Sequence, residues 1–185
     1  MMRNQTSIKF IGDALLGSDV FHTTKVMGDL EGIFRDEEKR KLISPETVVY
    51  EVDAYQPVNA GTQGGLFFGT TRIYPGLVGD EYFMTRGHFH ALADRSELYW
   101  GIGGAGMLIL MNRSRYVRIE KMGVGSLHYI PAHTAHRVAN TGEGILSFGA
   151  CWPSDAGYDY AEIKTKGFGG YLARVDGIPR LITLK

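Results

Sequence analysis

The chain has 185 residues, of which 44% are hydrophobic, and its 20 Lys and Arg residues balance 20 Asp and Glu residues to a formal net charge of zero. This balance argues against a dedicated nucleic-acid-binding protein, which normally carries a basic excess, and no apolar stretch approaches the roughly 20 residues that cross a bilayer. The single cysteine, Cys151, excludes a disulfide within the chain. Residues 1–17 lack the apolar segment of a signal peptide, so we expect a cytoplasmic protein.

The first part of the chain is mixed in character. Residues 8–11 form a short apolar segment. One helix is expected to begin at Asp29, because apolar residues from Leu30 to Leu42 lie near helical spacing, and the charged run 35–41 would form its solvent-exposed face.

After Pro45 the pattern changes to short β-type segments that glycines and turns separate. These segments cover residues 48–52, 66–74, 81–85, 97–102, 107–111, 116–119, 126–130, 136–139 and 145–152. Strands this short and this regularly interrupted predict an all-β barrel or sandwich. Residues 171–185 contain two further apolar runs, for which we expect an edge strand or a dimer contact.

The most informative residues are two histidines with a glutamate. His88 and His90 are two residues apart, so on a strand they face the same way, and a hairpin over residues 93–96 would bring Glu97 back beside them. His136 follows a proline turn farther along the chain. A bare pair of such histidines is more often a surface or core feature, but together with Glu97 and His136 it favours a metal site. Three nitrogens and one carboxylate oxygen suit Fe²⁺, Mn²⁺, Ni²⁺, Co²⁺ or Zn²⁺.

These two clusters resemble the paired motifs of the cupin superfamily. The second motif is close to the usual pattern, with Gly125, Pro131, His136 and Asn140 in the expected places and His133 where a glycine is usual. The first motif is looser. Six residues separate its second histidine from its glutamate, which is more than the common three or four, and Tyr82 stands where a leading glycine is usual.

The longer gap points to a narrower group, the cupin-type glucose-6-phosphate isomerases known mainly from archaea. The resemblance covers roughly residues 28–170. It rests on Leu30-Glu31-Gly32, Val49-Tyr50-Glu51-Val52, Thr70-Thr71, Tyr74-Pro75-Gly76, Thr85-Arg86-Gly87-His88-Phe89-His90-Ala91, Asp94-Arg95, Glu97, Tyr99, Tyr129-Ile130-Pro131, Ala135-His136-Arg137, Asn140 and residues 153–160.

The resemblance implies one cupin domain over residues 1–185, with its metal-site core at about 48–160. The expected fold is an all-β, double-stranded β-helix or jelly-roll-like barrel with one N-terminal helix. The expected protein is a homodimeric enzyme that interconverts glucose 6-phosphate and fructose 6-phosphate, with no nucleic-acid or membrane partner. One divalent ion per chain is expected, Fe²⁺ first and Mn²⁺, Ni²⁺, Co²⁺ or Zn²⁺ as alternatives.

The same resemblance implies residue roles. The metal ligands would be His88, His90, Glu97 and His136. Glu97 would also be the catalytic residue, because a carboxylate beside a metal can exchange a proton with the substrate. Substrate would be bound by Thr71, Thr85 and Gly87 at the phosphate and by Tyr99 and Tyr160 at the sugar. By residue type alone, the two threonines would be read as ordinary strand residues.

The sequence departs from this family at two positions. Trp152 and Tyr158 stand where tyrosine and histidine are frequent, so ring opening assisted by an imidazole is in doubt, and both residues stay outside the expected catalytic set. Two other functions remain open, a different metal-dependent cupin enzyme such as an oxygenase and a non-catalytic sugar-phosphate-binding cupin. An enediol route and a hydride shift also both remain open for the isomerisation.

Overall fold

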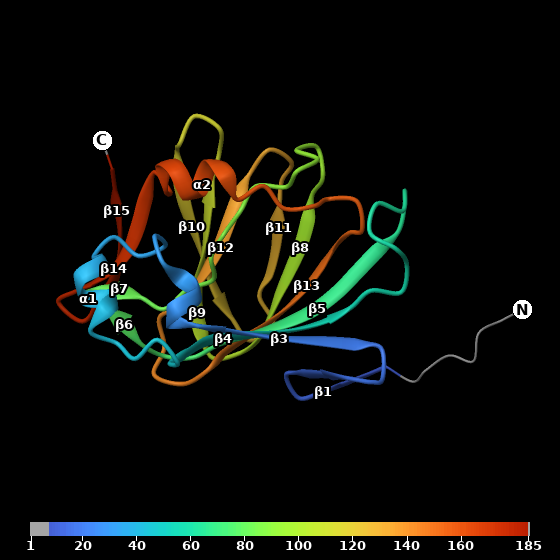
Figure 1. Ribbon diagram of the computed structural model, residues 1–185, viewed down its shortest axis with the longest axis horizontal. Helices are drawn as coiled ribbons and strands as arrows, with labels where there is room; N and C mark the ends of the chain where they lie inside the picture. The colour runs from blue at the N-terminus through green and yellow to red at the C-terminus, as the bar shows by residue number, and fades with distance from the viewer. Residues whose placement is uncertain (1–7, 185) are drawn as a thin grey trace, which may run out of the picture.

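Residues 8–184 are described by a computed structural model, in which antiparallel strands dominate and a few short helices lie at one edge (Figure 1). The predicted domain limits, residues 1 and 185, and the first seven residues of the N-terminal segment lie outside this range. The strands are β1 (Lys9–Ile11), β2 (Ala14–Leu16), β3 (Val20–Val26), β4 (Val48–Tyr55), β5 (Leu66–Ile73), β6 (Leu77–Val78), β7 (Glu81–Tyr82), β8 (Glu97–Gly103), β9 (Ala105–Met111), β10 (Val117–Gly123), β11 (Leu127–Ile130), β12 (Ala135–Asn140), β13 (Leu146–Pro153), β14 (Gly170–Val175) and β15 (Ile178–Thr183).

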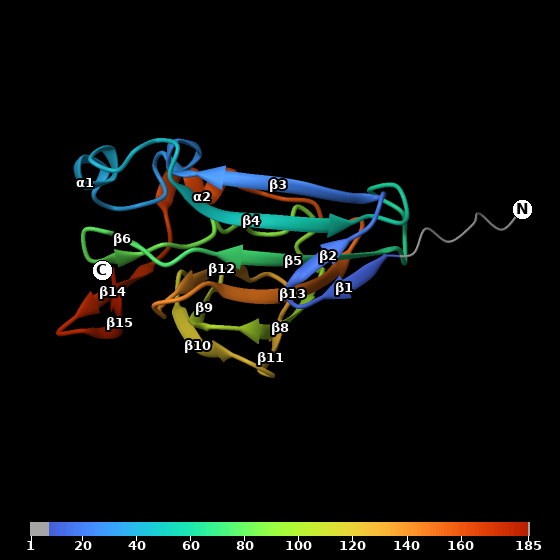
Figure 2. The same ribbon diagram turned by 90° about the horizontal axis from the view of Figure 1, so that it is seen from below.

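Two sheets build the body of the molecule. Six strands pair in the order β11-β8-β13-β5-β4-β3, and three pair in the order β10-β9-β12 (Figure 2). Ile73 and Phe148 on the larger sheet share one buried core with Leu108 and Leu110 on the smaller sheet. Each fully buried side chain of this size contributes about 1.5–3 kcal/mol, so the apolar faces hold the two sheets together. The predicted all-β cupin fold is confirmed.

Side chains of the six-stranded sheet alternate between its inner and outer faces. Thr23, Thr71 and Phe148 lie in one row across the sheet, joined through the pairing of β3, β4, β5 and β13, and this row lines an internal cavity. His22 and Asp53 belong to the next row, on the outer face, where His22 Nδ1 lies 2.7 Å from Asp53 Oδ1. The register of the sheet therefore decides which residues reach the cavity.

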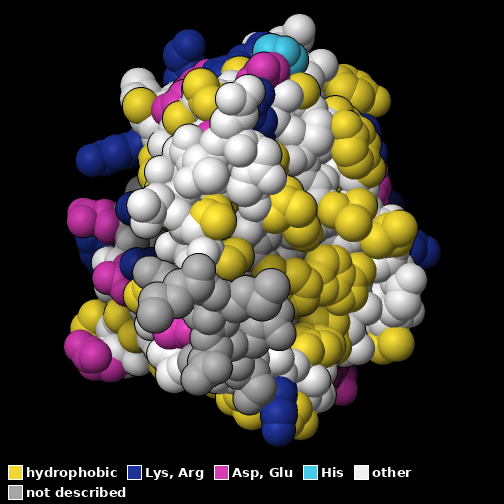
Figure 3. Space-filling view, turned by 90° about the vertical axis from the view of Figure 1, so that its right-hand side faces the viewer, with side chains coloured by type: hydrophobic (Ala, Val, Ile, Leu, Met, Phe, Trp, Pro, Cys, Tyr) yellow, Lys and Arg dark blue, Asp and Glu magenta, His cyan; other side chains and the backbone are white. Residues whose placement is uncertain are grey.

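The outer face of the same sheet is partly apolar. Leu66, Leu98, Leu127 and Tyr129 are exposed, and pairing places Leu98 opposite Tyr129 and Leu66 opposite Pro153. Figure 3 shows hydrophobic side chains gathered on the side of the molecule that carries the loop between β4 and β5. The outer face of the six-stranded sheet therefore offers apolar area outside the core.

The predicted N-terminal helix is only partly correct. The segment contains a 3₁₀-helix, η1 (Met27–Leu30), and a five-residue helix, α1 (Glu37–Lys41). Gly32 has a φ of 75°, which interrupts a continuous right-handed helix. Asp36 begins α1, since its side chain accepts a hydrogen bond from the Lys39 N–H at 3.0 Å.

A second helix, α2 (Ala161–Lys166), was not expected from the sequence. Tertiary contacts hold it, because Arg113 pairs with Glu162 at 2.6 Å and Arg115 donates to the Lys166 carbonyl at 3.0 Å. In the tail, the two apolar runs form the β14–β15 hairpin, which pairs with β7. Within residues 8–184, none of the helices has the length and apolar run that crossing a membrane takes.

Candidate metal centre and cavity

Backbone pairing beside β12 brings two of the histidines together. The His88 N–H donates to the His136 carbonyl at 3.3 Å, and the His136 N–H donates back to the His88 carbonyl at 3.1 Å. These bonds make an antiparallel bridge, so the two imidazole rings lie with centroids 4.5 Å apart. A contact between residues 48 positions apart in the chain is thus set by a local sheet-like pairing.

A turn after His90 returns Glu97 to the same point, as the sequence predicts. The turn closes with a hydrogen bond from the Arg95 N–H to the Leu92 carbonyl at 3.1 Å, and β8 then begins at Glu97. Two hydrogen bonds from the Arg95 guanidinium to Asp155, at 2.9 and 2.7 Å, anchor the turn to the segment after β13.

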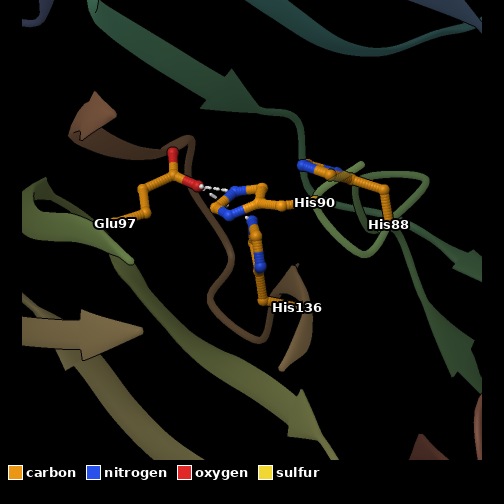
Figure 4. Close-up of side chains that lie close together, drawn as sticks. All are labelled: His88, His90, Glu97 and His136. Carbon is orange, nitrogen blue, oxygen red and sulfur yellow. Dashed lines mark hydrogen bonds and ion pairs between the residues drawn. The ribbon is translucent and has the colours of Figure 1, made fainter. Parts of the chain in front are cut away.

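The ligand-type atoms of His88, His90, Glu97 and His136 all lie within 4.8 Å of one another. Figure 4 shows the four side chains converging, with Glu97 Oε2 3.1 Å from His90 Nε2 and 3.1 Å from His136 Nε2. Glu97 and His136 are 6% and 1% exposed. Four potential ligands from three separate segments therefore meet at a site that is largely shielded from solvent.

The donor atoms fit a bound cation better than they fit one another. His136 Nε2 is buried without a hydrogen-bond partner, although the Glu97 carboxylate is close, because that contact lacks hydrogen-bond geometry. His90 Nδ1 lies 2.9 Å from the Arg95 carbonyl, so in the neutral ring Nδ1 carries the proton and Nε2, which faces Glu97 at 3.1 Å, presents its lone pair to the cluster. Metal-binding histidines typically have this arrangement, in which the outer nitrogen donates to a carbonyl.

Charge at the cluster also suits a cation. Burial by itself raises the pKa of Glu97, but His136 and His90 outweigh burial and lower the pKa to about 2. Burial, with His136 close by, lowers the pKa of His88 well below its ordinary value. An ionised carboxylate and a neutral imidazole are the forms that bind metal ions.

A cavity of about 330 Å³ opens beside the cluster. Every residue predicted for the site lines it except His90. The lining includes Thr71, Thr85, Gly87, His88, Glu97, Tyr99, His136 and Tyr160. Tyr99 is 8% exposed, and burial together with the nearby negative charge of Glu97 raises the pKa of its hydroxyl well above the ordinary value. Its hydroxyl is therefore neutral in the cavity beside Glu97.

Sequence reasoning left several cavity residues unassigned. The Tyr158 ring lies with its centroid 4.7 Å from that of His88 and stacks on Tyr160 at 5.8 Å. Trp152 lines the same wall above Gly69, where a Cβ would come within 3.1 Å of the indole ring. The departures at positions 152 and 158 were a usable signal for both residues. Lys25 lines the cavity too, and nothing in its sequence context indicated it.

The remaining histidines lie elsewhere. His128 sits between Glu120 and Ser126, at 2.8 and 2.9 Å, and His22 bonds to Asp53 on the outer face. His133 is exposed, and its N–H donates to the Ala93 carbonyl at 2.6 Å. These three residues therefore occupy structural or surface positions outside the metal cluster.

The fold and the four converging ligands define a cupin with a candidate centre of three histidines and one glutamate. A family model described as "Glucose-6-phosphate isomerase (GPI)" matches residues 24–177. The chain belongs to this glucose-6-phosphate isomerase family, as the sequence predicts, and the predicted enzyme class is confirmed with it.

Relatives agree with the family model. Glucose-6-phosphate isomerase of Thermococcus kodakarensis is 43% identical over 157 residues, which cover 84% of this chain and 82% of the relative. The enzyme of the same name from Pyrococcus horikoshii is 40% identical over 158 residues, with the same coverage of both chains. Oxalate decarboxylase from Bacillus subtilis, a solved structure, matches 60% of this chain and 26% of its own at 18% identity and a TM-score of 0.45.

Proposed function

We propose that the protein interconverts glucose 6-phosphate and fructose 6-phosphate with one divalent metal ion at His88, His90, Glu97 and His136. The observation that carries the proposal is the convergence of these four groups at one end of a cavity, in a chain of the glucose-6-phosphate isomerase family. Neither an oxygenase nor a non-catalytic sugar-binding protein gains support from the family or from the relatives.

A metal ion bound there would act as a Lewis acid that polarises the carbonyl of the open-chain sugar. The chain's own contribution is a buried ligand set in which the Arg95 carbonyl orients His90. Fe²⁺ is the ion that we propose, with Mn²⁺, Ni²⁺, Co²⁺ and Zn²⁺ as outcomes of the test. Elemental analysis of the purified protein, followed by reconstitution of the stripped protein with each ion, measures the preference.

The sugar phosphate would lie along the cavity with its phosphate at Thr71, Thr85 and Gly87. The Thr85 hydroxyl oxygen already accepts from the Val138 N–H at 3.1 Å, so its own proton is free to donate. Gly87 has a φ of 74°, and a Cβ there would lie 2.9 Å from the Arg137 Cβ, so only glycine keeps this backbone in place and open to an anion.

The spacing along the sheet agrees with a six-carbon substrate. Thr71 pairs with Phe148, and Phe148 pairs with Gly101, which is four residues from Glu97 on β8. Four strand residues and two strand spacings place the Cα atoms of Thr71 and Glu97 about 16 Å apart, which leaves room between the two side chains for an extended sugar chain with its phosphate. Tyr99 and Tyr160 would flank the carbon chain in between.

Glu97 is the carboxylate among the described residues that line the cavity, so both possible routes use it. In an enediol route it takes the proton from the carbon and returns it to the neighbouring carbon. In a hydride route hydrogen moves directly between C1 and C2, and Glu97 transfers only a proton between O1 and O2. Turnover in deuterium oxide separates the two, because only the enediol route introduces deuterium at carbon.

A coupled assay with fructose 6-phosphate tests the main proposal. The metal-loaded protein should turn over, a chelator should abolish the rate, and Glu97→Ala should lower kcat by about 10²- to 10⁴-fold. A metal-loaded protein without turnover would refute the proposal, and an unchanged rate in Glu97→Ala would remove this residue from the chemistry.

Assembly and location belong to the same proposal. We propose a cytoplasmic homodimer, and the apolar outer face at Leu66, Leu98, Leu127 and Tyr129 supports pairing of two copies. Light scattering should give twice the chain mass, and Leu98→Asp should shift the protein toward the monomer. A monomeric wild-type protein would refute the dimer.

A further inference from the structure

The end of the cavity opposite the metal cluster contains two cationic side chains that the isomerase assignment leaves unused. Lys25 and Arg86 both line the cavity. Arg86 follows Thr85 in the chain, and Lys25 lies two residues along β3 from Thr23, which shares a row of the sheet with Thr71. Within residues 8–184, neither of them has a carboxylate within ion-pairing distance. Two uncompensated cations at the same end of a cavity are a local charge excess in a chain whose net charge is zero.

Strand geometry directs Lys25 into the cavity. Lys25 lies on β3, the edge strand of the six-stranded sheet, and alternate residues of this strand, Phe21, Thr23 and Lys25, line the cavity. Lys25 pairs with Tyr50, and the register then shifts so that Val26 pairs with Val48. Such a β-bulge bends and twists the strand and re-aims side chains, often beside active sites.

Neighbouring groups leave the ammonium group of Lys25 available. Asp29, in the 3₁₀-helix η1 that follows β3, uses its carboxylate to accept the Val26 N–H at 3.2 Å. The Arg86 guanidinium lies 5.4 Å from the centre of the Tyr160 ring, a contact that keeps its charge. Both cations are therefore free to meet an anionic ligand.

The geometry points to Lys25 as a phosphate-binding residue that, with Arg86, neutralises the phosphate monoester of the substrate. This inference rests on the proposed function. A phosphate monoester carries about −1.5 to −2 charges at pH 7, which two cations match. Thr71, Thr85 and Gly87 supply neutral donors for the oxygens but no charge. Lys25 thus makes the site selective for phosphorylated over neutral sugars of the same length.

Binding of matched anions tests this role without turnover. Calorimetry with 6-phosphogluconate and gluconate on the metal-loaded protein compares two six-carbon acids that differ in the phosphate. Loss of one charge-assisted hydrogen bond lowers binding affinity by about 10- to 100-fold. Lys25→Met should lower the affinity for 6-phosphogluconate by this factor and leave the affinity for gluconate unchanged. Lys121→Met, on an exposed position of β10, removes the same charge outside the cavity and should change neither.

Kinetics give a second readout. Lys25→Met should raise KM for fructose 6-phosphate with little change in kcat, and Lys25→Arg should retain most of the affinity because it keeps the charge. The inference is overturned if Lys25→Met weakens the binding of both acids equally. It is also overturned if the variant keeps its melting temperature and binds 6-phosphogluconate as tightly as the wild type. If the wild-type protein binds 6-phosphogluconate but does not turn over fructose 6-phosphate, the isomerase activity is refuted. The difference in 6-phosphogluconate affinity between the wild type and Lys25→Met still measures the role of Lys25 in phosphate binding.

Discussion

The two ends of the cavity are built in different ways. At the metal end, His90, Glu97 and His136 are nearly inaccessible, and the Arg95 carbonyl orients the His90 ring. At the other end, Lys25 sits on an edge strand and Arg86 on an irregular segment, and both are half-buried. The difference suits their tasks, since metal coordination tolerates little displacement, whereas an ammonium group on a flexible stem can follow a phosphate.

The contrast predicts that changes at the metal end act on metal content and kcat, and changes at the other end act on affinity. His136→Ala should show the largest effect, because it removes a ligand and opens a hole beside two other histidines. Metal affinity should fall by more than the roughly 10- to 100-fold that follows loss of a group supporting a ligand. Metal content after dialysis and the isomerase rate measure it.

His133→Asn is the matched control for that variant. His133 is exposed and has a φ of 60°, a conformation that asparagine tolerates. The His133→Asn variant should retain its metal content and its isomerase rate. Equal loss of metal in both variants would contradict a specific role of His136.

Gly87→Ala should come next in size and act at the phosphate end. A φ of 74° costs a non-glycine residue about 1–2 kcal/mol, and the new Cβ would meet Phe168 and Arg137 within 2.9 Å. Urea unfolding and 6-phosphogluconate binding should both weaken. Gly125→Ala has a similar φ of 77° with no atom within 4 Å, so it isolates the backbone cost. If Gly125→Ala is as harmful as Gly87→Ala, crowding at Gly87 is not important.

Arg95→Met should have a smaller effect on the metal end. It removes both bonds to Asp155 that anchor the turn, while the Arg95 carbonyl still accepts from His90. Metal affinity should fall by up to about 10-fold, below the range for direct loss of a group supporting a ligand. Stability should change little, because water screens this ion pair. Lys41→Met, which removes an exposed pair with Glu38, should leave metal affinity unchanged.

The smallest predicted effect lies on the outer face of the sheet, on the side of the strands that faces away from the cavity. Burial opposes ionisation of Asp53, but His22 and Arg72 outweigh burial and lower its pKa. A lowered folded-state pKa contributes stability above the ordinary pKa of about 4, and this stability is lost as pH falls through the folded-state value. Asp53→Asn should therefore cost about 1 kcal/mol at pH 7, and less below pH 4.

Urea unfolding at both pH values measures this difference. Glu46→Gln, at an exposed position, serves as the control and should change stability little at either pH. A cost of Asp53→Asn that is equal at both pH values would show that packing, and not charge, is responsible.

Much of the metal end follows from the sequence alone. Alternation along a strand predicts that His88 and His90 face the same way, and the turn after residue 92 predicts the return of Glu97. The short interrupted strands predict the all-β fold. These features depend on neighbours a few residues apart, where strand period and turn chemistry act directly.

Only the tertiary structure decided the rest. The bulge opposite Lys25, the approach of Tyr158 to His88, and the contacts of Arg113 and Arg115 that hold α2 join segments far apart in the chain. The N-terminal helix is shorter than its apolar spacing suggested, because Gly32 interrupts it and divides the segment into η1 and α1. Local patterns carry no information on which distant strand supplies a neighbour, so the composition of the cavity becomes definite only when the sheets close.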